Sequence, residues 1–159
     1  MEIGLQTPLG PVCLTETDGV IRGLHWRAAP PGGDDAGGDD AGGDSAGLRE
    51  AAAQVRAYFD GRLTRFDLTL DWGTGLQAQL RRAMAAIPFG QTRTYGDLAR
   101  QIGVPAQAIG QACGANPLPI LIPCHRVLGA SSLGGFSARG GVETKVWLLR
   151  HEGAAGLLI

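Results

Sequence analysis

The sequence predicts an α+β protein in two parts, with a small antiparallel sheet in residues 1–71 and a mostly helical part in 72–159. Two patterns predict this division. Apolar and polar residues alternate between residues 2 and 26, which is typical of half-buried strands, whereas helical spacing dominates beyond residue 75. With 159 residues and 44% hydrophobic side chains, the chain is long enough to bury a core.

Three strands are expected first, joined by tight turns. The alternating segments are Glu2–Thr7, 12–17 and Val20–Trp26. The segments Pro8-Leu9-Gly10 and Asp18-Gly19 separate them, and both contain residues that favour turns. We therefore expect an antiparallel sheet in which neighbouring strands are joined by hairpin turns.

A flexible, solvated loop is expected at residues 28–47, because a Gly-Gly-Asp repeat leaves almost no side chain to bury. A calcium-binding loop is the alternative, but the repeat matches neither the EF-hand spacing nor the nonapeptide calcium repeat. Helical spacing resumes at residues 48–59. Alternation at Phe66, Leu68 and Leu70 predicts a last strand in this part.

The C-terminal part is expected to open with a helix at residues 76–86, which ends before Pro88-Phe89-Gly90. Thr94 is the expected N-cap of the next helix, because Asp97 stands three residues later and supports the first turn. That helix is expected to run to about Ile102.

A second short helix, Ala106–Gly114, follows the turn Gly103-Val104-Pro105, and the pair resembles a helix-turn-helix. Small residues dominate this helix, so its backbone can approach another surface closely, either a DNA groove or a neighbouring helix. The chain is expected to close with an amphipathic helix at 143–152. Its expected core residues are Val146, Trp147 and Leu149.

Charge is distributed unevenly, although the net charge is only −1. Residues 1–70 hold six arginines and eleven acidic residues, whereas residues 71–159 hold seven arginines and Lys145 against four acidic residues. The C-terminal part is therefore basic enough to meet a phosphate backbone, although ordinary charge scatter is an equally good explanation.

The three cysteines show no disulfide pattern, and the N-terminus does not have the pattern of a signal peptide. No apolar run approaches the roughly 18 residues of a membrane span. We therefore expect a cytoplasmic protein without membrane contact.

The segment Pro123-Cys124-His125-Arg126-Val127 carries the most chemical information, and it follows the apolar run 118–122. The thiolate is the reactive form of cysteine, and a free thiol with a pKa of ~8.5 is only slightly ionised at neutral pH. His125 is the nearest group that can lower this pKa. For the pair alone, the alternative is a buried apolar cysteine beside a surface histidine.

With the motifs around this pair, the chain closely resembles the O6-alkylguanine-DNA alkyltransferases, also called methylated-DNA–protein-cysteine methyltransferases. The resemblance is strong over residues 72–153 and weaker over the N-terminal part. An Asn-Pro motif and Pro-Cys-His-Arg-Val at this spacing are highly specific. The matching segments are 87–95, 114–117, 123–127, 140–142, Lys145, 148–149 and 151–153.

The resemblance implies a ribonuclease-H-like domain at 1–71 and a winged-helix-like domain at 72–159 that binds DNA and accepts the alkyl group. The implied activity is suicide DNA repair, an irreversible transfer of an alkyl group from O6-alkylguanine or O4-alkylthymine to Cys124 after base flipping. The implied partner is alkylated double-stranded DNA, bound through its minor groove by a monomer. We expect no cofactor and no metal site, because Cys13 and the histidines show no ligand spacing.

The same resemblance assigns catalytic roles to four residues. Cys124 is implied as the nucleophile, His125 as its base, and Glu152 as the group that orients the imidazole. Because neighbours on an extended segment point to opposite sides, we expect a water to bridge the thiol and the imidazole. Asn116 is implied to hold the turn that carries Cys124.

Roles in binding are implied for a second set of residues. The set consists of Tyr95, Gln107, Ala108, Pro119, Arg126, Val127 and Ser137. Tyr95 is implied to rotate the target nucleotide out of the duplex, and the carbonyls of Cys124 and Val127 to recognise the guanine edge. Pro119 is implied to pack near the alkyl group and Ser137 to contact the substituted oxygen. Taken singly, Tyr95 and Ser137 have ordinary alternatives as a core aromatic and a loop residue.

Gln107 departs from the family, which usually has an arginine here that fills the gap left by the flipped base. Glutamine can hydrogen-bond to the orphaned base, but it supplies neither charge nor good stacking. Two alternatives therefore stay open, a lesion-binding sensor and an alkyl sink that acts on non-duplex substrates. A cysteine hydrolase also fits the Cys-His-Glu set, although nothing in the sequence suggests an oxyanion hole.

Overall fold

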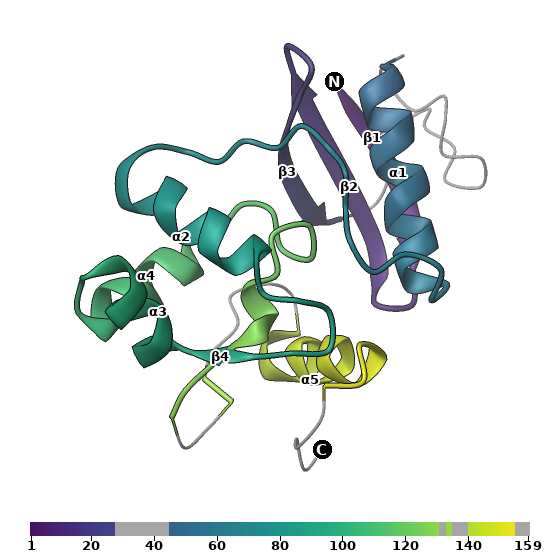
Figure 1. The fold of residues 1–159 in the computed structure, drawn as a ribbon. Coiled ribbons are helices and arrows are strands. Elements are labelled where there is room, and N and C mark those ends of the chain that lie inside the picture. The colour runs from purple at the N-terminus through teal and green to yellow at the C-terminus, as the bar shows by residue number, and fades with distance from the viewer. Residues whose placement is uncertain (28–44, 131–132, 135–139, 155–159) are drawn as a thin grey trace. The chain divides into compact units, whose positions relative to one another are not determined.

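The computed structural model describes residues 1–27, 45–130, 133–134 and 140–154 (Figure 1). The chain forms two compact units, Met1–Asp71 and Trp72–Ile159. Strands and helices are both present, and the three-stranded sheet is antiparallel, which confirms the α+β class. Within the described ranges, no helix is both long and apolar enough to cross a membrane.

The first unit is an antiparallel sheet covered by one helix. Its strands pair side by side in the order β1 (Glu2–Thr7), β2 (Gly10–Thr17) and β3 (Val20–Trp26). Ile3, Leu14 and Leu24 stand opposite one another in the register, and all three are buried. Because side chains alternate between the faces of a sheet, these residues form one apolar face. The predicted strands are confirmed, with β2 beginning two residues earlier than expected.

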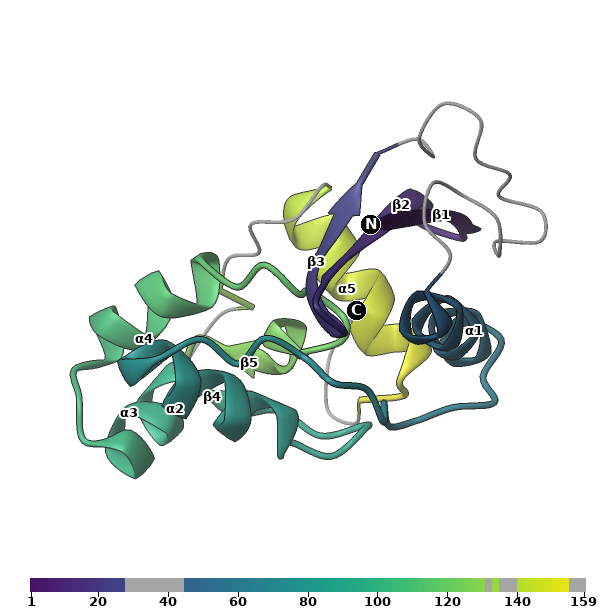
Figure 2. The same cartoon turned by 90° about the horizontal axis from the view of Figure 1, so that it is seen from above.

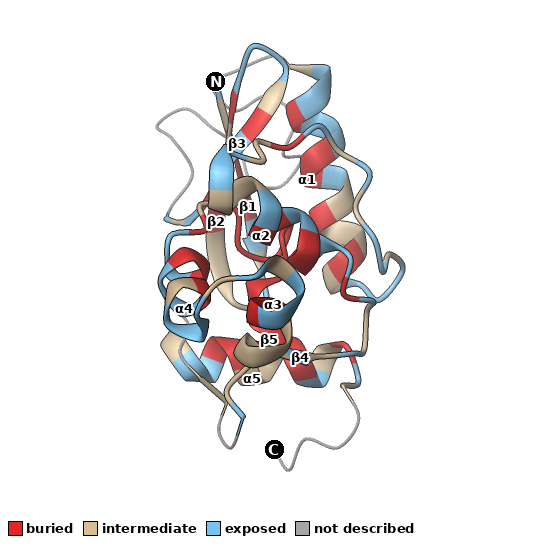
Figure 3. Ribbon diagram, turned by 60° about the vertical axis from the view of Figure 1, so that its left-hand side comes forward, coloured by how far each residue is buried: buried red, intermediate tan, exposed pale blue. Residues whose placement is uncertain are grey.

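Helix α1 (Ala46–Phe59) packs against all three strands of this sheet (Figure 2). Ser45 caps the helix, and its hydroxyl accepts a hydrogen bond from the backbone N–H of Leu48 at 3.2 Å. The buried residues of α1 recur at helical spacing, so that in Figure 3 red bands recur along the helix between exposed and partly buried positions. They are Leu48, Ala51, Ala52, Val55 and Tyr58.

Two expectations for this unit need correction. The loop expected at 28–47 is too long at its C-terminal end, because α1 already begins at Ala46; residues 28–44 lie outside the described part of the chain. The strand expected at Phe66, Leu68 and Leu70 is wrong. Only Leu70 forms an isolated parallel bridge, with Ile21, because its neighbours on the chain find no further ladder partner on β3.

The second unit is mostly helical, as predicted. Its helices are α2 (Gly75–Ala85), α3 (Tyr95–Ile102), α4 (Ala106–Gly114) and α5 (Gly141–His151). Thr94 and Asp97 form the predicted capping box, in which each side chain accepts a hydrogen bond from the other's backbone N–H. Gly103 ends α3 in the left-handed conformation, with a φ of 87°, and starts the turn into α4. The predicted helix-turn-helix pair is therefore present, and α3 packs against α4.

A very short parallel ladder joins two distant segments of this unit. Strand β4 (Arg93–Thr94) pairs with β5 (Val127–Leu128), with Arg93 opposite Val127. Strands of two residues carry no periodicity, so the sequence gives no signal for them. The ladder brings the start of α3 beside the turn that carries Cys124.

The buried face of α5 differs from the predicted one. Leu149 is buried as expected, but Val146 and Trp147 are only partly buried. Thr144, Lys145 and Leu148 take the interior positions instead.

Candidate active site

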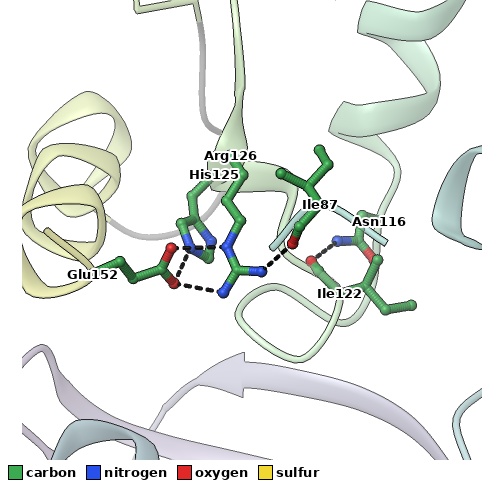
Figure 4. A network of polar contacts seen from close by, with 6 residues as sticks. All are labelled: Ile87, Asn116, Ile122, His125, Arg126 and Glu152. Atoms are coloured by element: carbon green, nitrogen blue, oxygen red, sulfur yellow. Dashed lines mark hydrogen bonds and ion pairs between the residues drawn. The ribbon is translucent and has the colours of Figure 1, made fainter. Parts of the chain in front are cut away.

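Cys124 lies on a tight turn whose position is fixed by Asn116. The turn is the 3-10 helix η1 (Cys124–Arg126), so this segment is not extended as expected. The Asn116 Nδ2 donates to the Ile122 carbonyl at 3.0 Å (Figure 4), and its Oδ1 accepts from the Leu118 N–H at 3.0 Å. The Ile122 carbonyl also accepts from the Cys124 N–H at 2.7 Å. One side chain thus fixes both ends of the loop that leads to the cysteine.

A buried network of ionisable groups follows Cys124 directly. The His125 Nε2 lies 2.7 Å from Glu152 Oε2, and both side chains are fully buried. Arg126 donates from Nε to Glu152 Oε1 at 2.8 Å and from Nη2 to Oε2 at 3.0 Å (Figure 4). Its Nη1 donates to the Ile87 carbonyl at 2.6 Å. Glu152, the C-terminal cap of α5, is therefore shared by the two residues that follow the cysteine.

The shared carboxylate determines the protonation of this network. Burial alone raises the pKa of Glu152, but the hydrogen bonds and charges of His125 and Arg126 bring it down to about 2. Burial lowers the pKa of His125 and outweighs the opposite effect of Glu152, so the imidazole is neutral at pH 7. Because Arg126 already balances the carboxylate, Glu152 does not require a charged imidazole.

The contact with Glu152 determines which ring nitrogen of the neutral His125 carries the hydrogen. Nε2 faces Glu152 and carries the hydrogen, which leaves Nδ1 with a free lone pair. His125 Nδ1 is buried and has no hydrogen-bond partner among the described residues. The arrangement supplies a base atom that is oriented from behind by a carboxylate.

The cysteine itself is not pre-ionised. Burial raises the pKa of Cys124, while the Asn116 side chain, the Lys145 ammonium and its own backbone N–H act to lower it. Cys124 as a whole is only 8% exposed. Since His125 is uncharged, it does not lower the pKa of Cys124 through an ion pair.

Lys145 is the group that sequence reasoning matched to the family without giving it a role. Its side chain is fully buried, and Nζ donates to the Val127 carbonyl at 2.6 Å. The same Nζ lies 5.9 Å from the centre of the Tyr95 ring. Burial lowers the pKa of Lys145 to about 8, against the opposing effect of the two nearby thiols, Cys124 and Cys113. Its spacing of three and four residues from Leu148 and Leu149 is the signal that places it on the buried face.

The remaining predicted residues occupy different surroundings. Tyr95 is the first residue of α3, is partly buried, and faces Gly134, where an added Cβ would lie 2.8 Å from the ring. Pro119 is buried in the loop before Cys124. Gln107 is exposed and Ala108 partly buried in the first turn of α4, and neither takes part in the network of Figure 4. Ser137 lies outside the described residues.

The structure thus brings most of the predicted residues into one unit. Arg126 turns inward to Glu152 and the Ile87 carbonyl, a position that the sequence did not indicate. Over the described ranges, no group of three His, Cys, Asp or Glu side chains could hold a metal ion.

The second unit combines a buried cysteine, a histidine–glutamate pair and a helix-turn-helix, which is the combination expected of a DNA-binding protein with a reactive thiol. The family model described as 6-O-methylguanine DNA methyltransferase, DNA binding domain, matches residues 75–154. The chain belongs to the O6-methylguanine-DNA methyltransferase family.

Relatives support the same assignment. The methylated-DNA–protein-cysteine methyltransferase of Mycobacterium bovis is 49% identical over 106 residues, which are 64% of this chain and 63% of that protein. The protein of the same name from Salmonella typhimurium is 50% identical over 101 residues, 60% of this chain and 58% of its own length. These sequence matches therefore span less than two thirds of the relatives.

Solved structures match over a longer part of the chain. The crystal structure of Mycobacterium tuberculosis OGT in complex with DNA has a TM-score of 0.78 at 36% identity, and covers 96% of this chain and 92% of that one. The O6-methylguanine DNA methyltransferase of Methanococcus jannaschii has a TM-score of 0.65 at 24% identity, with 98% and 96% covered, which shows the shared fold.

Proposed function

We propose that this protein repairs alkylated DNA in a single turnover, by moving the alkyl group from O6 of guanine, or O4 of thymine, to Cys124. One observation carries the proposal. The buried Cys124 follows a loop fixed by Asn116, and the next residue is a neutral histidine oriented by Glu152 with a free base atom. Family membership supports this reaction over other thiol chemistry, since the relatives are named as methylated-DNA–protein-cysteine methyltransferases.

The proposed reaction begins with removal of the thiol proton. The proton of Cys124 passes through a water to Nδ1 of His125, and Glu152 stabilises the imidazolium that forms. Lys145 stabilises the thiolate by charge, as its effect on the pKa of Cys124 indicates. The thiol therefore ionises at the moment of reaction, which is consistent with a resting pKa raised by burial.

Alkyl transfer then follows as a direct displacement. A bond forms between the Cys124 sulfur and the alkyl carbon while the bond from that carbon to O6 breaks. The electron pair of the broken bond stays with guanine, which takes up a proton as it leaves, assisted by the hydroxyls of Tyr95 and Ser137. The thioether has no good leaving group, so the protein is consumed by one lesion.

We further propose that duplex DNA is bound through its minor groove by the helix-turn-helix, with a monomer as the active form. The small residues of α4 suit a narrow groove, and Gln107 and Ala108 stand at its first turn. The target base must leave the stack, at a cost of about a few kcal/mol, before it reaches the cysteine. We assign rotation of the nucleotide to Tyr95, the first residue of α3, and recognition of the guanine edge to the carbonyls of Cys124 and Val127.

Of the predicted binding residues, Arg126 receives a different role in this proposal, and Pro119 keeps its role. Arg126 acts as a positioning residue for Glu152, because its guanidinium donates hydrogen bonds to the Glu152 carboxylate and to the Ile87 carbonyl. Pro119 limits the space beside the alkyl group from within the loop.

We also propose a cytoplasmic location. All three cysteines are free thiols, which suits a reducing cytoplasm.

The test is incubation with a duplex that carries O6-methylguanine. We expect the peptide containing Cys124 to gain the mass of one methylene while the lesion disappears in equal amount. A lesion that persists while no such mass appears would refute the proposal.

The alternative of an alkyl sink or a lesion sensor is not favoured by the relatives, but Gln107 allows it to be tested. We expect Gln107→Arg to speed transfer from duplex several-fold, because a guanidinium fills and stacks in the gap better than an amide. Transfer from free O6-benzylguanine should stay unchanged. Equal rates from duplex and free base in the unaltered protein would support the alkyl sink instead.

A further inference from the structure

One residue of the loop before Cys124 has a backbone conformation that its side chain disfavours. The φ of Ile120 is 74°, in the left-handed region. Asp18 is the other non-glycine residue with positive φ in the described ranges, and it belongs to the Asp18-Gly19 turn, where Asp is tolerated. For a β-branched residue this region is a true outlier, so the surrounding structure must hold Ile120 in place.

The loop around Ile120 is closed by hydrogen bonds on both sides. The Ile122 N–H donates to the Leu118 carbonyl at 2.8 Å, and the Leu121 N–H donates to the Pro119 carbonyl at 2.9 Å. The strained residue therefore sits inside a turn that starts two residues before it and ends two residues after it. A glycine would adopt this φ without strain, so the backbone alone does not explain an isoleucine.

The side chain supplies the explanation. Ile120 is only 1% exposed, so its aliphatic group is anchored in the core of the unit. Burial of this group offsets the backbone strain. The anchor and the turn are thus coupled, since the side chain cannot stay in the core if the backbone leaves the left-handed region.

The turn leads directly to the reactive thiol. The Ile122 carbonyl, at the end of the turn, accepts from Asn116 Nδ2 at 3.0 Å (Figure 4). The same carbonyl accepts from the Cys124 N–H at 2.7 Å. Rotation at Ile120 would move this carbonyl, and with it the two bonds that place Cys124.

We infer that Ile120 is a positioning residue for Cys124, whose anchored side chain holds the loop in the strained conformation that the thiol requires. It acts through Ile122 and Asn116 and does not touch the substrate. The inference deepens the proposed function, and it rests on that function only where alkyl transfer is the measurement.

The test compares Ile120→Gly with Leu121→Gly. Leu121 is the next residue, is also buried at 3% exposure, and is not among the residues with positive φ, so it controls for a lost side chain and added glycine freedom. We expect Ile120→Gly to slow transfer from methylated duplex by about 10-fold to 100-fold, because small misplacements of a reacting atom cost that much. Leu121→Gly should slow transfer less than Ile120→Gly does, but it should lower the melting temperature more, because this substitution relieves no backbone strain.

The conservative variant Ile120→Val keeps a β-branched side chain in the core. Its transfer rate should stay within about threefold of that of the unaltered protein.

A second measurement is independent of DNA repair. The rate at which iodoacetamide modifies Cys124, read by peptide mass, should change more in Ile120→Gly than in Leu121→Gly. If the glycine variants do not fold, Ile120→Ala and Leu121→Ala form a milder pair with the same expected order. Absence of methyl transfer in the unaltered protein would refute the proposed function alone, because the iodoacetamide comparison still applies. Equal rates in the two variants by both measurements, or an unaltered rate in Ile120→Gly, would overturn the role of Ile120.

Discussion

The two units of this protein bury different kinds of side chain. In Met1–Asp71 the core is apolar, and Glu16 is the one buried acidic or basic side chain among the residues described. In Trp72–Ile159 the described buried residues include five acidic or basic side chains besides the apolar core. They are Arg81, His125, Arg126, Lys145 and Glu152. Burial of ionisable groups costs free energy unless each is paired, so the second unit retains them at the expense of stability.

The difference teaches where stability and reactivity reside. Glu16 has a structural task, since it accepts from the Gly19 N–H at 3.2 Å and from the hydroxyl of Ser45, the N-cap of α1. In the second unit, His125 and Arg126 instead follow Cys124 on the chain and share the Glu152 carboxylate, and the Lys145 charge acts on the pKa of the Cys124 thiol. We therefore expect substitutions in the first unit to change stability alone, and substitutions in the second to change transfer as well.

The largest effect on transfer is expected from Cys124→Ser. A serine hydroxyl at this position is a far weaker nucleophile than a thiolate, so no alkyl adduct should form. Cys113→Ser is the matched control, because Cys113 is also a buried thiol in the same unit but contacts Met84. Intact-mass measurement after incubation with methylated duplex checks both variants. An adduct on the serine variant, or on Cys113 in place of Cys124, would contradict the assignment of the nucleophile.

The next largest effect is expected from Glu152→Gln, which should lower both the stability of the protein and the rate of alkyl transfer. The variant leaves the Arg126 guanidinium buried without its counter-charge, which costs about 3–5 kcal/mol of stability. Transfer should fall about 100-fold or more, because the imidazole loses both its orientation and the stabilisation of its charged form. Glu143→Gln, at an exposed acid in the first turn of the same helix, should leave both the denaturation midpoint and the rate unchanged.

The lowered pKa of Glu152 also predicts how the stability of the protein changes at low pH. The pKa of Glu152 is about 2 in the folded protein and 4.5 as its ordinary value, so the unfolded chain binds its proton first as the pH falls. Its contribution is complete above about pH 4.5 and is lost as the pH falls toward 2, on the order of 3 kcal/mol in total. Denaturation midpoints at pH 6 and pH 3 should therefore differ more in the unaltered protein than in Glu152→Gln. A difference of the same size in both would show that other groups dominate acid unfolding.

Lys145→Met should lower transfer by about tenfold at pH 7 with a smaller change in stability. The variant removes the charge that supports the thiolate, but it also removes a buried ammonium and its desolvation cost. With a folded pKa of about 8, Lys145 is charged below that pH, and its support for the thiolate is lost as the pH rises through 8. The rates of the two proteins should therefore converge above pH 8. A constant ratio at all pH values would indicate that Lys145 acts only through the Val127 carbonyl.

Elements with local signals could be predicted from the sequence. The bounds of α4, the capping box at Thr94 and the strands β1 and β3 follow from spacing and turn residues that lie close together on the chain. Features that depend on residues far apart on the chain could not be predicted in this way. The ladder between Arg93 and Val127 is too short for periodicity, and the inward turn of Arg126 depends on Glu152, 26 residues away. The left-handed conformation of Ile120 has no sequence signal, because the residue is atypical for that region.

The smallest effect on transfer is expected from Leu14→Ala, which tests the comparison of the two units directly. Leu14 is fully buried in the sheet of the first unit, and its truncation should cost about 2–5 kcal/mol of stability through the cavity it leaves. Leu148→Ala is the matched substitution in the second unit, because Leu148 is equally buried but stands three residues from Lys145 on α5. Both variants should lose comparable stability, yet at temperatures where both are folded only Leu148→Ala should slow transfer, by several-fold. If Leu14→Ala slows transfer as much, then the reactive geometry depends on the core of the first unit, and stability and reactivity are not divided between the units.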